Sequence, residues 1–144
     1  MNRFSVLVTM IALGVGVAIG ATMSPVLVGH AQTKGRVFEI RTYTTHPGKL
    51  DALNARFRDH TTRIFGKHGM TNIAYWVPQD APASQNTLIY VIAHESREAA
   101  KKNWDEFRAD PEWVKARTES EAAGPIVVKV DSVFANPTDY SPVK

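Results

Sequence analysis

The sequence predicts an α+β domain: a four-stranded antiparallel sheet with its helices on one face. Two observations predict it. Hydrophobic periodicity switches between the two-residue repeat of strands and the 3.6-residue repeat of helices, in the order β-α-β-β-α-α-β. In addition, capping residues, Pro-Gly turns or glycines separate the segments. The chain of 144 residues is long enough for one domain of ordinary size.

Residues 36–45 are predicted to form the first strand, because their side chains alternate between two faces. One face carries Phe38, Ile40 and Thr42, and the other carries Glu39, Arg41 and Tyr43. Unpaired buried charge is costly, so the second face must meet water, a partner or a ligand.

The Pro47-Gly48 turn leads into a helix predicted over residues 49–67. Its apolar positions recur at helical spacing: Leu50, Leu53, Phe57 and Ile64. Gly69 fits a left-handed stop at the end of this helix. A second strand follows over 72–77, and a surface loop over 78–86 leads to a third strand over 87–94. The third strand is apolar on both faces, which predicts that both faces are covered.

The second half begins with Ser96 as the N-cap of a helix that runs to residue 109. Asp110 and Pro111 then cap and start a third, short helix, and Gly124-Pro125 ends it. The last strand is predicted over residues 126–134.

This order is the split βαβ, ferredoxin-like pattern, in which the first and last strands are neighbours. We therefore expect Glu39 and Arg41 to share a face with Lys129 and Asp131 and to form ion pairs across the strands. The third strand needs a cover on the same face. Two sheets packed across a two-fold axis supply it, which predicts a homodimer through the face of Glu39, Arg41 and Tyr43.

The first residues do not resemble a globular domain. Met-Asn-Arg starts the chain, an uncharged apolar run follows, and Gly29-His30-Ala31 offers small residues before a cut at Gln32. This layout predicts a signal peptide over residues 1–31 and a periplasmic or secreted protein. The alternative is an uncleaved membrane anchor over residues 4–28. Residues 32–135 then form the domain, and 136–144 form a flexible tail.

Charge and composition exclude some classes. The formal net charge is +3, basic residues are interleaved with acids, and the chain has no cysteine. Without a basic stripe interleaved with aromatics, no nucleic-acid partner is expected. Without cysteine, disulfides, thiol chemistry and cysteine lipidation are excluded. Contact with a membrane is expected only through an uncleaved N-terminal segment.

Short motifs in order over residues 36–134 resemble the NIPSNAP family of the dimeric α/β-barrel superfamily. They are Glu39-Ile40-Arg41-Thr42-Tyr43, Pro47-Gly48-Lys49-Leu50, His68-Gly69 and Asp110-Pro111-Glu112-Trp113. The resemblance implies a ferredoxin-like dimer that forms a dimeric α/β barrel. Related barrels include cofactor-independent monooxygenases, haem-dependent enzymes and small-molecule stress proteins. The export segment departs from mitochondrial members of the family, which carry transit peptides.

Histidines and aromatics supply the candidate site. His60 and His68 lie near the inward stripe of the first helix, and we expect a ligand site there, between helix and sheet. Eight residues place them about 12 Å apart along the axis, too far to share one metal, so no metal site is expected. The remaining ligand-binding candidates are Arg41, Tyr43, Trp76 and Tyr90. His46 and His94 are expected at the surface. The alternatives are packed histidines and a structural ion pair of Arg41.

Three functions remain open. The first is an exported dimer that binds a small apolar or aromatic molecule. The second is a cofactor-independent or haem-dependent monooxygenase, and the third is a non-catalytic partner-binding module. The sequence identifies no catalytic residue and assigns no cofactor, so whether the protein is an enzyme is left undecided.

Overall fold

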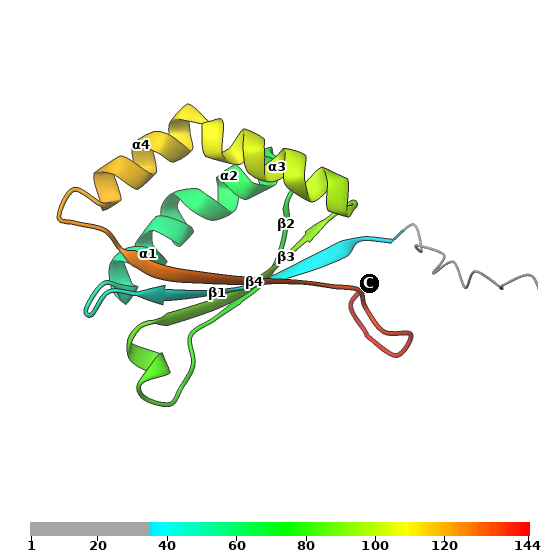
Figure 1. Cartoon of the computed structure of the whole chain (residues 1–144), viewed down its shortest axis with the longest axis horizontal. Helices are drawn as coiled ribbons and strands as arrows, with labels where there is room; N and C mark the ends of the chain where they lie inside the picture. The colour runs from blue at the N-terminus through cyan, green and yellow to red at the C-terminus, as the bar shows by residue number, and fades with distance from the viewer. Residues whose placement is uncertain (1–34) are drawn as a thin grey trace, which may run out of the picture. The chain divides into compact units, whose positions relative to one another are not determined.

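The computed structural model describes residues 35–144, and the predicted export segment lies outside them. Four antiparallel strands form one sheet in the order β2-β3-β1-β4, and the helices cover one of its faces (Figure 1). The elements are β1 (Val37–Thr45), α1 (Leu50–Arg56), η1 (Phe57–Thr61), α2 (Thr62–Lys67), β2 (Thr71–Trp76), η2 (Ala83–Gln85), β3 (Thr87–His94), α3 (Arg97–Ala109), α4 (Pro111–Ser120) and β4 (Val127–Ala135). The predicted ferredoxin-like fold class is confirmed. Within the described part of the chain, no helix has the length and hydrophobicity to span a bilayer.

The first helical segment is continuous but not uniform. Between α1 and α2 lies η1, one turn of π-helix. The Thr61 hydroxyl donates to the carbonyl oxygen of Arg56 at 3.1 Å inside this turn. A π-turn inserts extra backbone and changes the helical phase. Phe57 and Thr61, at the two ends of this turn, are buried, and so is Arg56 directly before it. The predicted inward residues are buried too: Leu50, Leu53, Phe57 and Ile64.

Capping residues end and start the helices where the sequence predicts. Gly69 follows α2 with φ +73°, a left-handed conformation that L side chains rarely adopt. Ser96 accepts a hydrogen bond from the amide of Ala99, and Asp110 accepts one from the amide of Glu112. Pro111 occupies the first turn of α4. These caps fix where α3 and α4 lie over the sheet.

The prediction for the two faces of β1 is wrong in one respect: its polar face is the one that the helices cover. Glu39 accepts a hydrogen bond from the indole of Trp104 in α3 at 2.7 Å. The ring of Tyr43 packs edge-on against Phe57, with centroids 5.8 Å apart. The face of Glu39, Arg41 and Tyr43 is therefore inside the domain and is not available for a dimer contact.

The expected cross-strand ion pairs are also wrong. In the observed register Arg41 lies opposite Ser132, and Thr42 lies opposite Asp131. Paired residues of an antiparallel ladder share a face, so Asp131 lies on the other face from Arg41. Lys129 instead pairs with Asp131 at 2.9 Å within its own strand.

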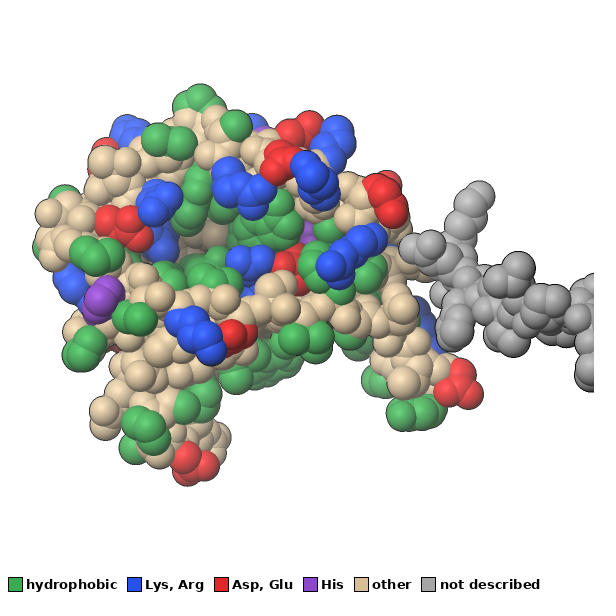
Figure 2. Space-filling model, viewed as in Figure 1, with side chains coloured by type: hydrophobic (Ala, Val, Ile, Leu, Met, Phe, Trp, Pro, Cys, Tyr) green, Lys and Arg blue, Asp and Glu red, His purple; other side chains and the backbone are tan. Residues whose placement is uncertain are grey.

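The uncovered face of the sheet, called the open face below, is apolar. Strand pairing brings together Phe38 with Ala93, Ile40 with both Val91 and Val133, and Trp76 with Ile89. Val133 is 61% exposed. Figure 2 shows hydrophobic side chains along the underside of the sheet, between two protrusions that Figure 1 identifies as the β2–β3 connection and the C-terminal tail. The tail has a turn, in which Ser141 donates its amide to the carbonyl of Thr138 at 3.1 Å.

The hydrophobic core lies between the helices and the opposite face of the sheet. It is dense in aromatic rings: Phe57, Phe65, Tyr90, Trp104 and Phe107. The predicted double burial of β3 is therefore half realised. Its helix-facing residues Leu88, Tyr90 and Ile92 are buried, whereas Ile89 and Val91 on the open face are only partly covered.

Candidate functional site

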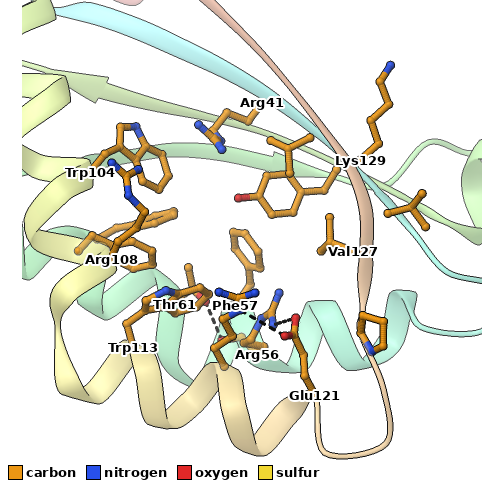
Figure 3. A pocket seen from close by; sticks show the side chains of 17 residues that line it. Arg41, Arg56, Phe57, Thr61, Trp104, Arg108, Trp113, Glu121, Val127 and Lys129 are labelled. Carbon is orange, nitrogen blue, oxygen red and sulfur yellow. Dashed lines mark hydrogen bonds and ion pairs between the residues drawn. The ribbon is translucent and has the colours of Figure 1, made fainter.

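A cavity of about 380 Å³ lies between the helical layer and the sheet, along β4 (Figure 3). Its size falls within the range of small-molecule sites, about 300–1,000 Å³. Its walls come from β1, β4 and every long helical segment. The lining residues are Arg41, Tyr43, Arg56, Phe57, Thr61, Phe65, Trp104, Phe107, Arg108, Trp113, Arg117, Glu121, Pro125, Val127, Val128, Lys129 and Val130.

Aromatic rings form much of the wall and hold one another in place. The ring centroids of Phe65 and Trp104 lie 5.4 Å apart, and those of Phe107 and Trp113 lie 4.5 Å apart. Pairs at these distances stabilise one another beyond the area that they bury. The cavity is therefore bounded by rigid, flat surfaces.

Arg56 is a buried cation in the floor of the cavity, at the last position of α1 and three residues after the buried Leu53. Arg56 is 5% exposed. Its Nη1 donates to Glu121 at 2.9 Å and to the Ser120 hydroxyl at 3.3 Å. The guanidinium carbon lies 5.3 Å from the ring centre of Trp113. Among residues 35–144, the buried Nε of Arg56 has no hydrogen-bond partner.

Glu39 is the centre of a buried polar network at the sheet wall. It is 1% exposed. It accepts hydrogen bonds from Arg41 and Ser132 at 2.6 Å, from Trp104 at 2.7 Å and from His94 at 3.1 Å. Burial by itself raises the pKa of the Glu39 carboxyl, but the hydrogen bonds from His94, Ser132, Trp104 and Arg41 outweigh it and lower that pKa to about 2. Glu39 is therefore a carboxylate at neutral pH.

This network positions Arg41. While Nη1 bonds to Glu39, the guanidinium carbon lies 4.3 Å from the ring centre of Trp104 and 5.6 Å from that of Tyr43. Its buried Nε has no partner among residues 35–144. Hydrogen bonding and stacking hold the planar cation in one orientation.

Tyr90, beside Arg41 on the next strand, stays neutral. The Tyr90 hydroxyl donates to the Tyr43 hydroxyl at 3.2 Å. Burial is the main cause that raises the pKa of the Tyr90 phenol well above its ordinary value. Tyr90 does not line the cavity, so it acts on the site through Tyr43.

The structure brings together some of the predicted site residues and separates others. Arg41 and Tyr43 line the cavity, and Tyr90 lies directly behind them. Trp76 pairs with Ile89 on the open face and is 53% exposed. His60 is exposed as well. The prediction that the first helix turns His60 toward the sheet is therefore wrong, because the π-turn changes the helical phase.

His68 and His94 form hydrogen bonds with residues that do not line the cavity. His68 Nε2 lies 2.7 Å from Asp110 Oδ2, where α2 meets the cap of α4. It does not line the cavity, so the cavity is not the site expected beside His60 and His68. His94 is buried, against the expectation of a surface position, and its ring bonds to Glu39 and to Asn103.

Several residues of the cavity escape the sequence-based prediction: Arg56, Trp104, Arg108 and Trp113. One available signal is Arg56 itself, which directly precedes the inward-facing Phe57 on a predicted amphipathic helix.

Among the described residues, no histidine lines the cavity. The described residues also contain no cluster of three side chains suited to hold a metal ion.

Comparisons agree with the fold. The family model described as NIPSNAP matches residues 38–142. A NIPSNAP family protein of unknown function from Agrobacterium tumefaciens has a TM-score of 0.66 at 20% identity, covering 78% of this chain and 96% of that chain. No curated protein matches the chain significantly.

Two oxygenases share the fold at lower similarity. A monooxygenase from Streptomyces coelicolor in complex with the ligand nanaomycin D has a TM-score of 0.53 at 15% identity, covering 77% of this chain and 95% of that chain. A cofactor-independent oxygenase from Streptomyces nogalater has a TM-score of 0.50 at 12% identity, covering 75% and 98% respectively.

Proposed function

This chain belongs to the NIPSNAP family, and from that premise we propose that it is a binding protein for a small, flat aromatic molecule. The cavity between the helices and the sheet is the binding site. The observation that carries this proposal is a space of about 380 Å³ that aromatic side chains surround and do not fill.

The cavity walls suit such a ligand. Phe57 and Trp113 present ring surfaces, and Thr61 and Tyr43 add hydroxyl groups among them. Apolar walls with a few fixed polar groups are the usual composition of a small-molecule site. The space opens to solvent beside β4, where Val128 and Val130 are exposed, so a ligand can enter it.

Filling the cavity is expected to remove binding. Val130 lies on β4 at the cavity wall and is 41% exposed. A Val130→Phe side chain takes up part of the space at little cost to the core. We expect naphthalene-2-carboxamide, a neutral two-ring probe, to bind this variant at least about tenfold more weakly than the parent protein. Isothermal titration calorimetry measures the difference.

The matched control is Val114→Phe. Val114 is 50% exposed on α4 and does not line the cavity. This variant should bind the probe as the parent does. Equal binding by the parent and the Val130→Phe variant would contradict the cavity as the site.

A cofactor-independent monooxygenase is the second candidate. It is favoured by the solved monooxygenase of similar fold that is in complex with the ligand nanaomycin D. Binding without catalysis stands first because no imidazole lines this cavity among the described residues, and the buried Tyr90 phenol is a poor base. Oxygen uptake with 1-naphthol decides between them: uptake that the Val130→Phe variant loses would favour the oxygenase. The third alternative, a partner-binding module without a pocket, does not explain the cavity.

Assembly and location are proposed separately. We propose a homodimer in which the open face of one copy covers that of another, because exposed Ile40 and Val133 leave a contiguous apolar surface on the sheet.

The location of the protein is proposed to be periplasmic or extracellular after removal of residues 1–31. N-terminal sequencing of protein from the native host should begin near Gln32.

A further inference from the structure

We propose that the ligand is an aromatic acid, and that Arg41 and Arg108 hold its anionic group. This inference rests on the proposed function and specifies its ligand class. The aromatic body lies deeper in the cavity, toward Phe57 and Trp113, while the acid group lies beside Trp104. Figure 3 shows Arg41 from β1 and Arg108 from α3 on the same side of the cavity, next to that indole.

The first observation is an excess of positive charge. Four arginine side chains line the cavity, whereas Glu121 is the one acidic residue in its lining among the described residues. Glu121 is already paired, with Arg56 at 2.9 Å and with Arg117 at 3.2 Å. The arginines are Arg41, Arg56, Arg108 and Arg117, of which Arg108 also pairs with Asp105 at 2.5 Å on the surface of α3. A cavity with low-dielectric walls and charge of one sign attracts and concentrates ligands of the opposite sign.

The second observation is the incomplete pairing of Arg41. Its side chain is 16% exposed and its Nε has no partner among residues 35–144. Its counter-ion, Glu39, also accepts hydrogen bonds from His94, Trp104 and Ser132. The negative charge of Glu39 is therefore shared among several donors. A buried guanidinium gains most from an acceptor that meets its fork of donors, which a carboxylate does well.

The third observation is a second hollow that meets the first one at Arg41, Trp104 and Arg108. It measures about 620 Å³, and its lining adds Arg97 and Lys101 of α3 together with the carboxylates of Glu39 and Glu98. Figure 2 shows basic side chains around the hollow between the helices and β4. An acid that enters here finds Arg41 and Arg108 at the junction of the two spaces. Its apolar rings then reach the aromatic part of the cavity.

The test compares two probes of nearly equal shape, 2-naphthoate and its neutral analogue naphthalene-2-carboxamide. We expect the parent protein to bind the acid at least about tenfold more tightly, the usual gain for a hydrogen bond to a charged group. This preference should shrink when NaCl rises from about 0.02 M to about 0.5 M. Isothermal titration calorimetry gives both affinities.

Arg108→Gln is the main variant, because the Arg108 side chain is 59% exposed and its removal leaves the core intact. We expect the preference for the acid to fall to about threefold or less, with carboxamide binding unchanged. Arg41→Lys should reduce the preference as well, because an ammonium lacks the guanidinium fork. Arg63→Gln is the matched control: Arg63 is 61% exposed on α2, pairs with Glu112 and does not line the cavity.

Each outcome has one meaning. If neither probe binds, both this inference and the proposed function are overturned. If both probes bind equally to the parent protein, this inference alone is overturned and the aromatic site stands. If the preference survives both Arg108→Gln and Arg41→Lys in variants that unfold at the parental temperature, the acid group lies elsewhere and the placement is wrong.

Discussion

Replacing Glu39 by Gln is expected to lower the free energy of unfolding by about 3–5 kcal/mol, the cost of breaking a buried ion pair by removing one partner. Glu39 is 1% exposed and neutralises Arg41 inside the domain. Glutamine is nearly isosteric but uncharged, so Arg41 loses its counter-ion. It also places an amide donor where Trp104 and Ser132 donate. Chemical denaturation followed by circular dichroism measures the loss.

The same carboxylate makes stability depend on pH, and the sign follows from its lowered pKa. The pKa is about 2 in the folded protein against an ordinary value of 4.5. The stabilisation is therefore fully present above about pH 4.5 and is lost as the pH falls toward 2, by about 3 kcal/mol in total. The Glu39→Gln variant should show a flatter decline between these pH values. Glu119→Gln, at an exposed position of α4, is the control and should follow the parent protein. A parental pH profile in Glu39→Gln would contradict the role of the network.

The second large effect is expected on assembly. Val133→Glu places a charge in the middle of the open face, and we expect it to convert a dimer to a monomer at micromolar concentration. Val133 is 61% exposed in the single chain, so the substitution costs the fold little while it puts an unpaired charge into the interface. Light scattering after size-exclusion chromatography gives the mass.

The control for this experiment lies on the same strand. Val130 points toward the helices, opposite Tyr43, so Val130→Glu should leave the dimer intact. If the parent protein is a monomer, the proposed dimer is wrong. If Val130→Glu dissociates the dimer and Val133→Glu does not, copies meet through the other face.

Most of the fold is predictable from local signals. Ser96, the Asp110-Pro111 pair and Gly69 each impose a helix boundary by backbone chemistry alone, and the structure has a boundary at each. The strands follow from period-two alternation. Such signals depend on neighbours in sequence, which are visible without the fold.

Local signals do not predict which face of the sheet the helices cover. Phe38 and Ile40 form the more hydrophobic face of β1, yet the helices cover Glu39 and Arg41. The reason is that Glu39 finds four donors, three of them more than fifty residues away in the chain. A buried charge is tolerated once it is paired and hydrogen-bonded. Its partners are known only when the chain is folded.

The candidate site is only partly predictable from the sequence, because some of its residues depend on how the chain folds. Arg41 and Tyr43 attract notice as polar residues on a strand with apolar neighbours, and both line the cavity. Arg56 and His60 depend on helical phase, and the π-turn from Phe57 to Thr61 shifts that phase. Arg56, at the end of α1, is buried, whereas His60 inside the turn is left in solvent. A uniform helical repeat does not predict such a shift.

The indole signals of the tryptophans test most directly whether the cavity between helices and sheet is a ligand site. Trp104 and Trp113 line it, whereas Trp76 lies on β2 outside it. In nitrogen–proton correlation spectra of the labelled protein, with peaks assigned by single Trp→Phe variants, 2-naphthoate is added stepwise. We expect the Trp104 and Trp113 indole peaks to shift together and saturate while the Trp76 peak stays in place. A shift of Trp76 alone, or no saturable shift of the other two, would contradict a ligand site in this cavity.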